Sequence, residues 1–405
     1  MMALLCRRLS YCKNQVSFFN TAKITRSRFS SFASTQPVHR AWSYSLKRLL
    51  SSSPSSSTQR VVGWWLVGCC GLISGSVLIG GLTRLTESGL SMTQWHLLKG
   101  MKPPSSQEQW EKEFQRYKEF PEYKYVHQDL TLSGFKKIFY LEYAHRMWGR
   151  LVGLAIIIPA VGFWARGRFG RALKTRASLY IGLVVCQGLL GWWMVKSGLK
   201  QKDDLSEVPR VSQYRLAAHL GMALLLYSSM LYTGLGLLAP PKIATPSKAL
   251  TRLRQFAHGS TALVFLTALS GAFVAGLDAG LVYNSFPKMG GKWIPEDLMS
   301  KSPAIKNVTE NPTMTQFNHR LLGTTTLCFL VSTFALARGV GLPPRARLAA
   351  SCMAGMCLVQ VGLGISTLLW FVPTPLAAAH QTGSVALLSF ALWLMSELRK
   401  KVPKL

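Results

Sequence analysis

The chain has 405 residues, of which 49% are hydrophobic and only 16% are charged, and its formal net charge is +31. The low share of charged residues excludes an ordinary soluble globular protein, in which about a quarter of the residues are charged. So large a basic excess would suggest nucleic acid as a partner if the chain were soluble. The distribution of the basic residues along the sequence instead favours a membrane protein that does not bind nucleic acid.

The first 60 residues have the composition of a mitochondrial transit peptide. They contain ten Lys and Arg, no Asp or Glu, and many serines, as in SLKRLLSSSPSSS. Transit peptides are rich in Arg and Ser and poor in acids. A disordered basic tail is the alternative, and a secretory signal is not expected because no apolar stretch precedes Val61. We predict cleavage somewhere before Val61.

Long apolar blocks fill much of the remaining sequence. A helix needs about 20 apolar residues to cross a hydrocarbon layer roughly 30 Å thick. Blocks this long and continuous favour helices over the short alternating strands of a membrane barrel. We therefore predict an all-α polytopic membrane protein with eight transmembrane helices. The blocks span residues 61–82, 143–165, 178–195, 216–238, 256–277, 317–337, 348–371 and 376–398.

The connections between these blocks alternate in charge. One set is basic and contains no acid: 166–176, 239–254 and 338–347. The other set mixes both signs and holds nearly all the acids: 84–141, 196–215 and 277–314. Because basic connections stay on the side from which a helix is inserted, both termini are expected on the basic side. In a mitochondrial inner-membrane protein, that side is the matrix.

The second half of the sequence repeats features of the first. LEYAHRMWGR at 141–150 has a counterpart in TQFNHRLLG at 315–323, and GLISGSVLIGGL at 71–82 resembles TALSGAFVAGLDAGL at 267–281. Such self-similarity predicts two tandem four-helix bundles. The predicted divisions are a transit peptide and linker at 1–60, a bundle at 61–240 that includes the outer connection 84–141, and a bundle at 241–405.

Each predicted bundle carries one histidine on its second helix and one on its fourth. The predicted topology places all four at one depth near the intermembrane space. A single histidine there is commonly an interfacial polar residue, but two imidazoles from facing helices suit axial ligation of haem iron. Zinc or copper would need a third or fourth ligand, and no other His or Cys is level with these pairs. We predict two bis-histidine haem sites, formed by His145 with His219 and by His319 with His380.

Charged residues flank two of these histidines. Arg146 and Arg320 directly follow a histidine, where each could bind a haem propionate or simply extend to the membrane interface. Glu142 lies three residues before His145 on the same helical face, whereas its counterpart Gln316 cannot exchange a proton. If one half carries out proton-coupled chemistry and the other only passes electrons, the half with the carboxylate is the reacting one, and we predict Glu142 as its catalytic residue. A plain ion pair between Glu142 and Arg146 is the alternative.

Several stretches resemble the haem A synthase family, whose members convert haem O to haem A for cytochrome oxidase. They are GGLTRLTESGLSMTQW at 80–95, FKKIFYLEYAHRMWGR at 135–150, the four histidines, and NHRLLG from Asn318. The resemblance covers essentially all of the chain after residue 60, and the transit segment favours the mitochondrial type. Some bacterial members carry a cysteine pair in the first outer connection. This chain has no cysteine there.

The resemblance implies different roles for the two halves. In the C-terminal half, His319 and His380 would hold a resident haem b cofactor. In the N-terminal half, His145 and His219 would hold the substrate haem O. The C8 methyl group of haem O would become a formyl group through two hydroxylations and loss of water. Glu142 would then transfer protons or stabilise a cationic intermediate.

The implied partners are haem O, an electron donor such as a ferredoxin, haem O synthase, cytochrome c oxidase assembly factors and membrane lipid. Self-association is left open by the sequence. Two other functions fit the same histidines: a bis-histidine haem b electron-transfer cytochrome and a non-enzymatic haem chaperone for oxidase assembly. The acid in one half and the amide in the other argue against a pure electron carrier.

Overall fold

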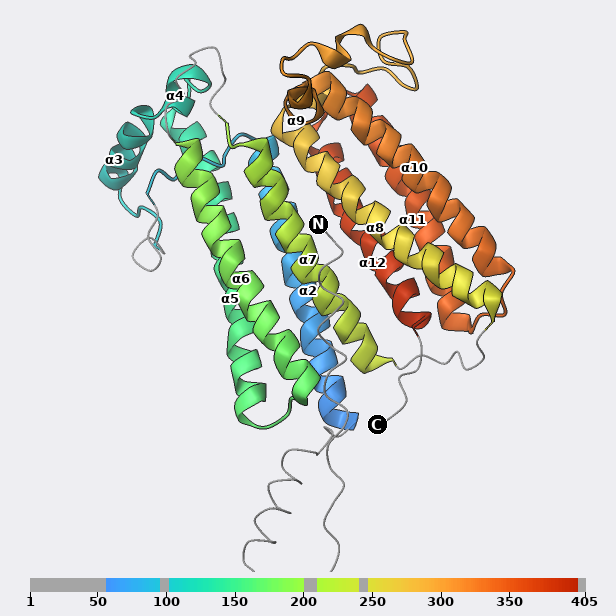
Figure 1. Ribbon diagram of the computed structural model, residues 1–405. Coiled ribbons are helices and arrows are strands. Elements are labelled where there is room, and N and C mark those ends of the chain that lie inside the picture. The colour runs from blue at the N-terminus through green and yellow to red at the C-terminus, as the bar shows by residue number, and fades with distance from the viewer. Residues whose placement is uncertain (1–55, 95–101, 200–209, 240–246, 400–405) are drawn as a thin grey trace, which may run out of the picture. The chain divides into compact units, whose positions relative to one another are not determined.

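The computed structural model describes residues 56–94, 102–199, 210–239 and 247–399 (Figure 1). Most of the predicted transit segment lies outside these residues. Within them, the regular structure is helical and contains no strand. The expectation of an all-α protein is therefore confirmed for the described part of the chain.

Eight long helices account for the eight apolar blocks, and they associate in two sets of four (Figure 1). The first set is α2 (Ser56–Leu85), α5 (Leu132–Ala165), α6 (Arg171–Gly198) and α7 (Gln213–Leu238). The second set is α8 (Lys248–Gly276), α10 (Pro312–Arg338), α11 (Pro344–Leu369) and α12 (Thr374–Glu397). The sets also contact each other, because α7 packs on α8 and α12 packs on α2 and α7.

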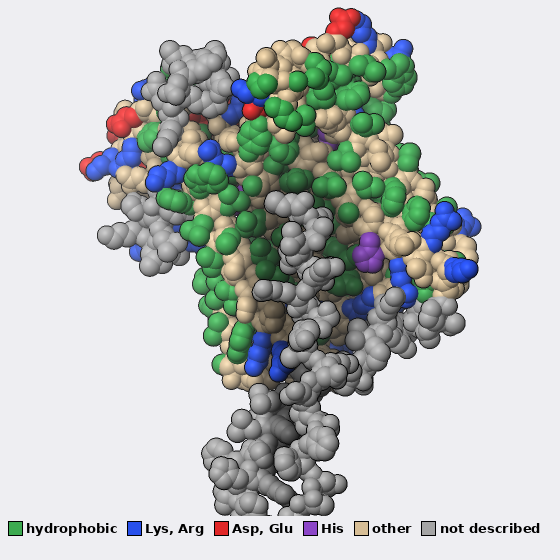
Figure 2. Space-filling view, in the orientation of Figure 1, with side chains coloured by type: hydrophobic (Ala, Val, Ile, Leu, Met, Phe, Trp, Pro, Cys, Tyr) green, Lys and Arg blue, Asp and Glu red, His purple; other side chains and the backbone are tan. Residues whose placement is uncertain are grey.

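Seven of these helices are long and apolar enough to cross a membrane, which makes the described chain a polytopic membrane protein. The eighth, α12, is not among these seven candidate spans, and its first turns carry the polar run His380-Gln381-Thr382-Gly383-Ser384. Hydrophobic side chains cover much of the helix flanks in Figure 2. On α5 the exposed ones include Leu151, Leu154, Ile158 and Val161. Side chains of this kind suit contact with lipid.

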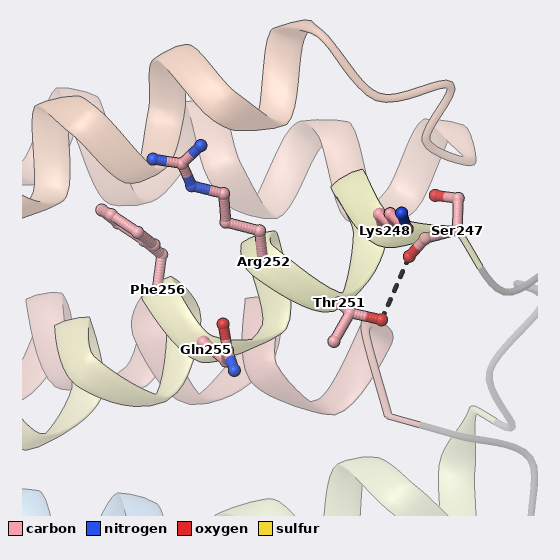
Figure 3. A pocket seen from close by; sticks show the side chains of 6 residues that line it. All are labelled: Ser247, Lys248, Thr251, Arg252, Gln255 and Phe256. Atoms are coloured by element: carbon pink, nitrogen blue, oxygen red, sulfur yellow. Dashed lines mark hydrogen bonds between the residues drawn. The ribbon is translucent and has the colours of Figure 1, made fainter.

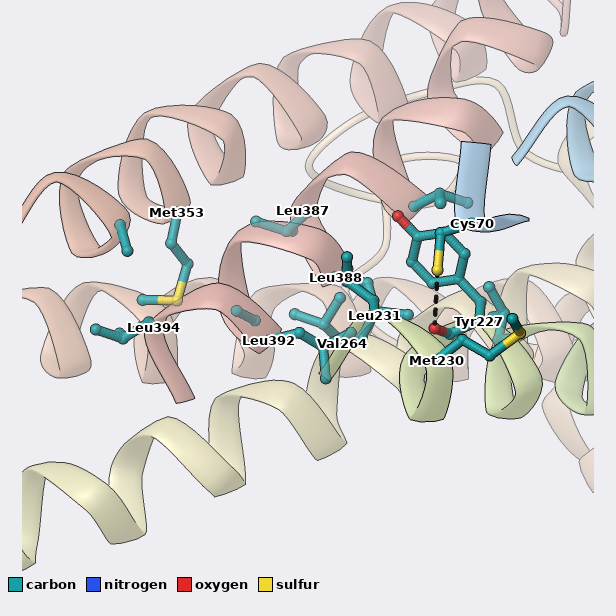
Figure 4. Close-up of a cluster of buried hydrophobic side chains, with 14 of the residues drawn as sticks. Cys70, Tyr227, Met230, Leu231, Val264, Met353, Leu387, Leu388, Leu392 and Leu394 are labelled. Atoms are coloured by element: carbon teal, nitrogen blue, oxygen red, sulfur yellow. Dashed lines mark hydrogen bonds between the residues drawn. The ribbon is translucent and has the colours of Figure 1, made fainter. Parts of the chain in front are cut away.

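Buried side chains of both sets form one continuous hydrophobic core (Figure 4). Polar contacts cross it. The Tyr227 hydroxyl lies 2.7 Å from the Ser389 hydroxyl, and the Gln381 amide donates to the Val77 carbonyl at 2.7 Å. The core joins α2 and α7 to α8, α11 and α12 through residues that include Cys70, Met230, Val264, Met353 and Leu388.

Two short helices, α3 (Gln107–Lys118) and α4 (Pro121–Tyr125), form part of the first long connection. The Ser106 hydroxyl caps α3 by accepting from the Gln109 N–H. The apolar face of α3 packs on the first turns of α5, which begins at Leu132 rather than at the apolar block. The buried side chains of this cluster are Trp110, Phe114, Tyr117, Phe135 and Phe139.

The matching connection in the second half contains only short helical turns. They are η2 (Ala279–Leu281), η3 (Glu296–Met299), η4 (Ala304–Lys306) and α9 (Asn307–Glu310). Asn311 caps α10 with its side-chain oxygen and donates from its amide to the carbonyls of Asp297 and Leu298. This residue therefore fixes the connection to the start of α10.

Candidate functional site

His319 on α10 and His380 on α12 lie opposite each other. Their ring centroids are 6.4 Å apart and their planes are at 89°. If two imidazoles face one iron through Nε2, metal–nitrogen bonds of about 2 Å place their centroids roughly 6.2 Å apart. The observed spacing therefore fits one haem iron between these two rings.

His145 on α5 and His219 on α7 form the corresponding pair in the first half. The Nδ1 atom of each ring is buried and has no hydrogen-bond partner among the described residues. No described residue therefore fixes the proton to one nitrogen of either ring, and Nε2 of each ring can present its lone pair to an iron. This pair is also compatible with a haem site.

The helix that precedes each histidine-bearing helix presents a glycine to the imidazole. A Cβ atom placed on three of these glycines would lie at or below 3.0 Å from the ring, which is closer than side-chain packing normally allows. The contact is looser at the fourth. The pairs and the distances to Cε1 are Gly80 with His145 at 2.7 Å, Gly191 with His219 at 3.0 Å, Gly364 with His380 at 2.8 Å and Gly271 with His319 at 3.4 Å.

The Gly364→Ala variant is expected to displace the His380 ring and to lower bound haem about tenfold, since shifts beside a metal ligand typically cost 10–100-fold in affinity. Haem per purified chain, measured as the pyridine complex, checks this. The control is Gly362→Ala on the same helix, where an added Cβ meets no atom within 4 Å. Equal haem content in the two variants would contradict the steric argument.

Glutamine side chains tie the fourth helix of each half to the third. The Gln187 amide donates to the backbone oxygen of His219 at 3.0 Å. The Gln360 amide donates to the backbone oxygen of His380 at 2.8 Å, and its nitrogen also lies 3.2 Å from Nδ1 of that ring. Sequence reasoning missed this role of the two glutamines.

The predicted catalytic residue Glu142 is buried and accepts three kinds of hydrogen bond. The Ser91 hydroxyl and the Met92 N–H each donate to its carboxylate at 2.7 Å, and Arg146 donates at 2.5 Å. Arg146 also donates to the backbone oxygens of Met92 and Gln94. The ion pair considered as the alternative role for Glu142 is therefore present. Together Glu142 and Arg146 hold the segment that follows α2 against α5.

Gln316 and Arg320 hold the second outer connection in the same way. The Gln316 amide donates to the backbone oxygens of Ala279 at 2.8 Å and Tyr283 at 3.2 Å. Arg320 donates to the oxygens of Tyr283 and Ser285 and to the Gln316 side chain. The acid of the first half thus meets donors, and the amide of the second half meets carbonyl acceptors. Each half therefore carries the side chain that its outer connection can bind: Glu142 accepts from donors, and Gln316 donates to carbonyl oxygens.

These contacts bear on the proposed propionate sites. The terminal nitrogens of Arg146 and Arg320 already donate to backbone oxygens of the outer connections. A haem propionate at either arginine therefore has to share or replace those hydrogen bonds.

A second buried carboxyl group, Glu122 on α4, was not predicted from the sequence. The Tyr117 hydroxyl donates to it at 2.9 Å and lies 2.8 Å from Nδ1 of His127. Burial and the nearby charges of Glu142 and Glu87 raise the pKa of Glu122 to about 8, against the opposing effect of the Tyr117 hydrogen bond. The folded connection therefore favours the protonated, neutral carboxyl group.

This proton makes the first connection sensitive to pH. A folded-state pKa of about 8 against an ordinary value of 4.5 means that stability is full below 4.5 and falls as the pH rises to about 8. We expect Glu122→Gln to remove this dependence, because an amide does not titrate. Hydrogen exchange of peptides from α3 and α4, corrected for intrinsic rates, measures it. Glu119→Gln at an exposed neighbouring position serves as the control, and an unchanged pH profile in Glu122→Gln would contradict the assignment.

A surface pocket lies far from the four predicted ligand histidines, at the start of α8 (Figure 3). In this pocket the Thr251 hydroxyl donates to the Ser247 carbonyl at 3.0 Å. The helical rise of about 1.5 Å per residue puts Gln255 about 22 Å along α8 from Ser270, which contacts His319. This pocket is therefore not part of the candidate site. Its lining comprises Ser247, Lys248, Thr251, Arg252, Gln255 and Phe256.

Comparison with known proteins agrees with these features. The family model of the cytochrome oxidase assembly proteins, COX15-CtaA, matches residues 63–392. The chain belongs to this family. The match includes part or all of each of the eight long helices among the described residues and all four predicted ligand histidines.

Curated relatives of this family align with most of the chain. A protein of Bos taurus named Heme A synthase COX15 is 61% identical over 353 residues, which are 87% of this chain and 85% of the relative. The Arabidopsis thaliana protein of that name is 42% identical over 363 residues, or 89% and 79%. A Nitrosospira multiformis protein named Heme A synthase is 44% identical over 346 residues, or 85% and 95%. The family resemblance, including the eukaryotic type, is confirmed.

Proposed function

We propose that the chain is a haem A synthase, an oxidoreductase that acts on haem O in the mitochondrial inner membrane and supplies cytochrome c oxidase. The observation that carries this proposal is the 61% identity, over 87% of the chain, to a protein named Heme A synthase. We place both termini in the matrix and count α12 as an eighth transmembrane helix. The sorting of charges and the repeated sequence support this topology.

We assign the two haem sites to separate bundles. The bundle at 241–405 holds a resident haem b through His319 and His380, and the 6.4 Å separation of their rings supports this assignment. The bundle at 61–240 binds haem O through His145 and His219. Each of the four imidazoles packs on a glycine of the neighbouring helix, and this contact supports a fixed ring orientation in both bundles.

The chemistry at the C8 methyl group removes electrons that no side chain can accept, and a haem bound in the chain would carry them. The contribution of the chain is to bind the porphyrin, fix its orientation and manage protons. Glu142 lies three residues before His145 on the same helix, and its carboxylate, paired with Arg146, would help to stabilise positive charge that develops at the porphyrin edge. Proton transfer by Glu142 requires one of its hydrogen bonds to break. The Ser91 hydroxyl donates one of these hydrogen bonds, at 2.7 Å.

Haems extracted from eukaryotic cells that lack the chain test this function. Without the chain, we expect haem A to be absent and haem O to accumulate, and re-expression should restore haem A. Normal haem A in cells without the chain would contradict the proposal. A ferredoxin is the proposed electron donor.

A further inference from the structure

Helices α8 and α10 of the second half are joined by a ladder of polar contacts. Its members on α10 are two helical turns apart, so they lie on one face of that helix. The contacts are Ser260 with Thr333 at 2.8 Å, Thr267 with Thr326 at 2.7 Å, and Ser270 with Nδ1 of His319 at 2.7 Å. The last of these contacts reaches a predicted iron ligand.

The position of the protons in this last contact follows from counting donors. Ser270 has one hydroxyl proton, which it donates to the backbone oxygen of Thr267 at 2.8 Å. Towards His319 the serine oxygen can then only accept. Nδ1 of His319 must therefore carry the ring proton, which leaves the Nε2 lone pair available for a metal. A hydrogen bond of this kind also makes the ligating nitrogen more basic and fixes the ring orientation.

The first half lacks this arrangement although it contains the equivalent serine. Ser74 precedes Gly75 as Ser270 precedes Gly271, but the Ser74 hydroxyl donates to the backbone oxygen of Cys70. Nδ1 of His145 has no hydrogen-bond partner among the described residues. In the sequence repeat, the positions of Thr267 and Thr326 are occupied by Gly71 and Val152, which cannot form the next rung.

We propose that Ser270 is a positioning residue that fixes the tautomer and orientation of His319, so that the second-half site retains its haem. The imidazole of His145, which has no such support, belongs to the site whose haem enters and leaves. This inference rests on the proposed function, in which haem b stays bound while haem O and its product exchange at every turnover. The hydrogen bond from His319 to Ser270 gives a physical reason why one haem stays bound and the other exchanges.

Haem loss from the purified full-length chain tests the inference. Excess apomyoglobin traps released haem, and its absorbance gives the rate of haem b loss. Ser270→Ala is expected to lose haem b about tenfold faster than the wild type. Its haem b should also have a more positive reduction potential, because a less basic ligand stabilises ferric iron less well. Ser270→Thr keeps the hydroxyl group and should restore slow loss.

Two matched variants distinguish positioning of His319 by Ser270 from a general effect of the polar contacts on helix packing. Ser74→Ala removes the equivalent hydroxyl of the first half, and Thr326→Val removes a rung of the ladder that does not contact a histidine. Both should keep the wild-type rate of haem b loss. Equal rates in Ser270→Ala and the wild type would overturn the inference, and so would equally fast loss in Thr326→Val. The assay does not depend on haem A formation. If the wild-type chain makes no haem A but Ser270→Ala still loses haem b faster than the wild type, the proposed function is refuted and the role of Ser270 stands.

Discussion

Purified His380→Ala is expected to contain less than about a tenth of the haem b of the wild type, because the iron loses one of its two protein ligands. The change also empties the space between α11 and α12 that the ring fills against Gly364. His319 keeps its hydrogen bond from Nδ1 to Ser270, so a single, correctly oriented ligand remains. Residual haem should therefore show the spectrum of a site with one histidine.

The measurement is haem b per chain together with the visible spectrum of the reduced protein. His258→Ala is a suitable control, because His258 is exposed on α8 and its ring contacts the backbone oxygen of Arg254. Unchanged spectra in His380→Ala would rule out this residue as an axial ligand.

Glu142→Gln is expected to retain haem b and to accumulate haem O or a hydroxylated intermediate in place of haem A. The amide is nearly isosteric with the acid but carries no negative charge and cannot accept a proton in the same way. Its NH2 group would also meet a donor in either orientation, because Ser91 and Met92 donate to one carboxylate oxygen and Arg146 donates to the other. Chromatography of extracted haems measures the outcome.

A second variant separates chemistry from anchoring at this position. Ser91→Ala removes one hydrogen bond of the anchor and keeps the carboxylate of Glu142 and its pairing with Arg146. We expect its rate of haem A formation to fall by no more than about tenfold, since a hydrogen bond from a hydroxyl to a carboxylate contributes roughly 1.5 kcal/mol. Normal haem A output from Glu142→Gln would refute the catalytic role, and equal losses in the two variants would reduce Glu142 to an anchor.

The sequence predicted the long helices because an apolar block of membrane length has few other stable conformations. It did not predict that α5 begins at Leu132. Those first turns are polar enough to read as a connection, and they become helical where Phe135 and Phe139 pack on α3. Tertiary contacts of this kind have no signal in local hydropathy.

The contacts of each histidine depend on how neighbouring helices are aligned along their axes. The sequence repeat predicts this alignment incorrectly in the first half. The repeat pairs Gly75 with Gly271. In the structure His319 packs on Gly271, whereas His145 packs on Gly80 and Gly75 meets Trp148 instead. A shift between helices therefore separates His145 from Ser74 while His319 meets Ser270. The histidines could be predicted as candidates, but their supporting residues could not.

Analysis of the haems extracted from the purified wild-type chain tests the central claim most directly. If one histidine pair holds the cofactor and the other holds the substrate, the purified chain contains haem b together with haem O, haem A or a hydroxylated intermediate between them. A pure electron-transfer cytochrome would contain haem b alone, and that result would contradict the account.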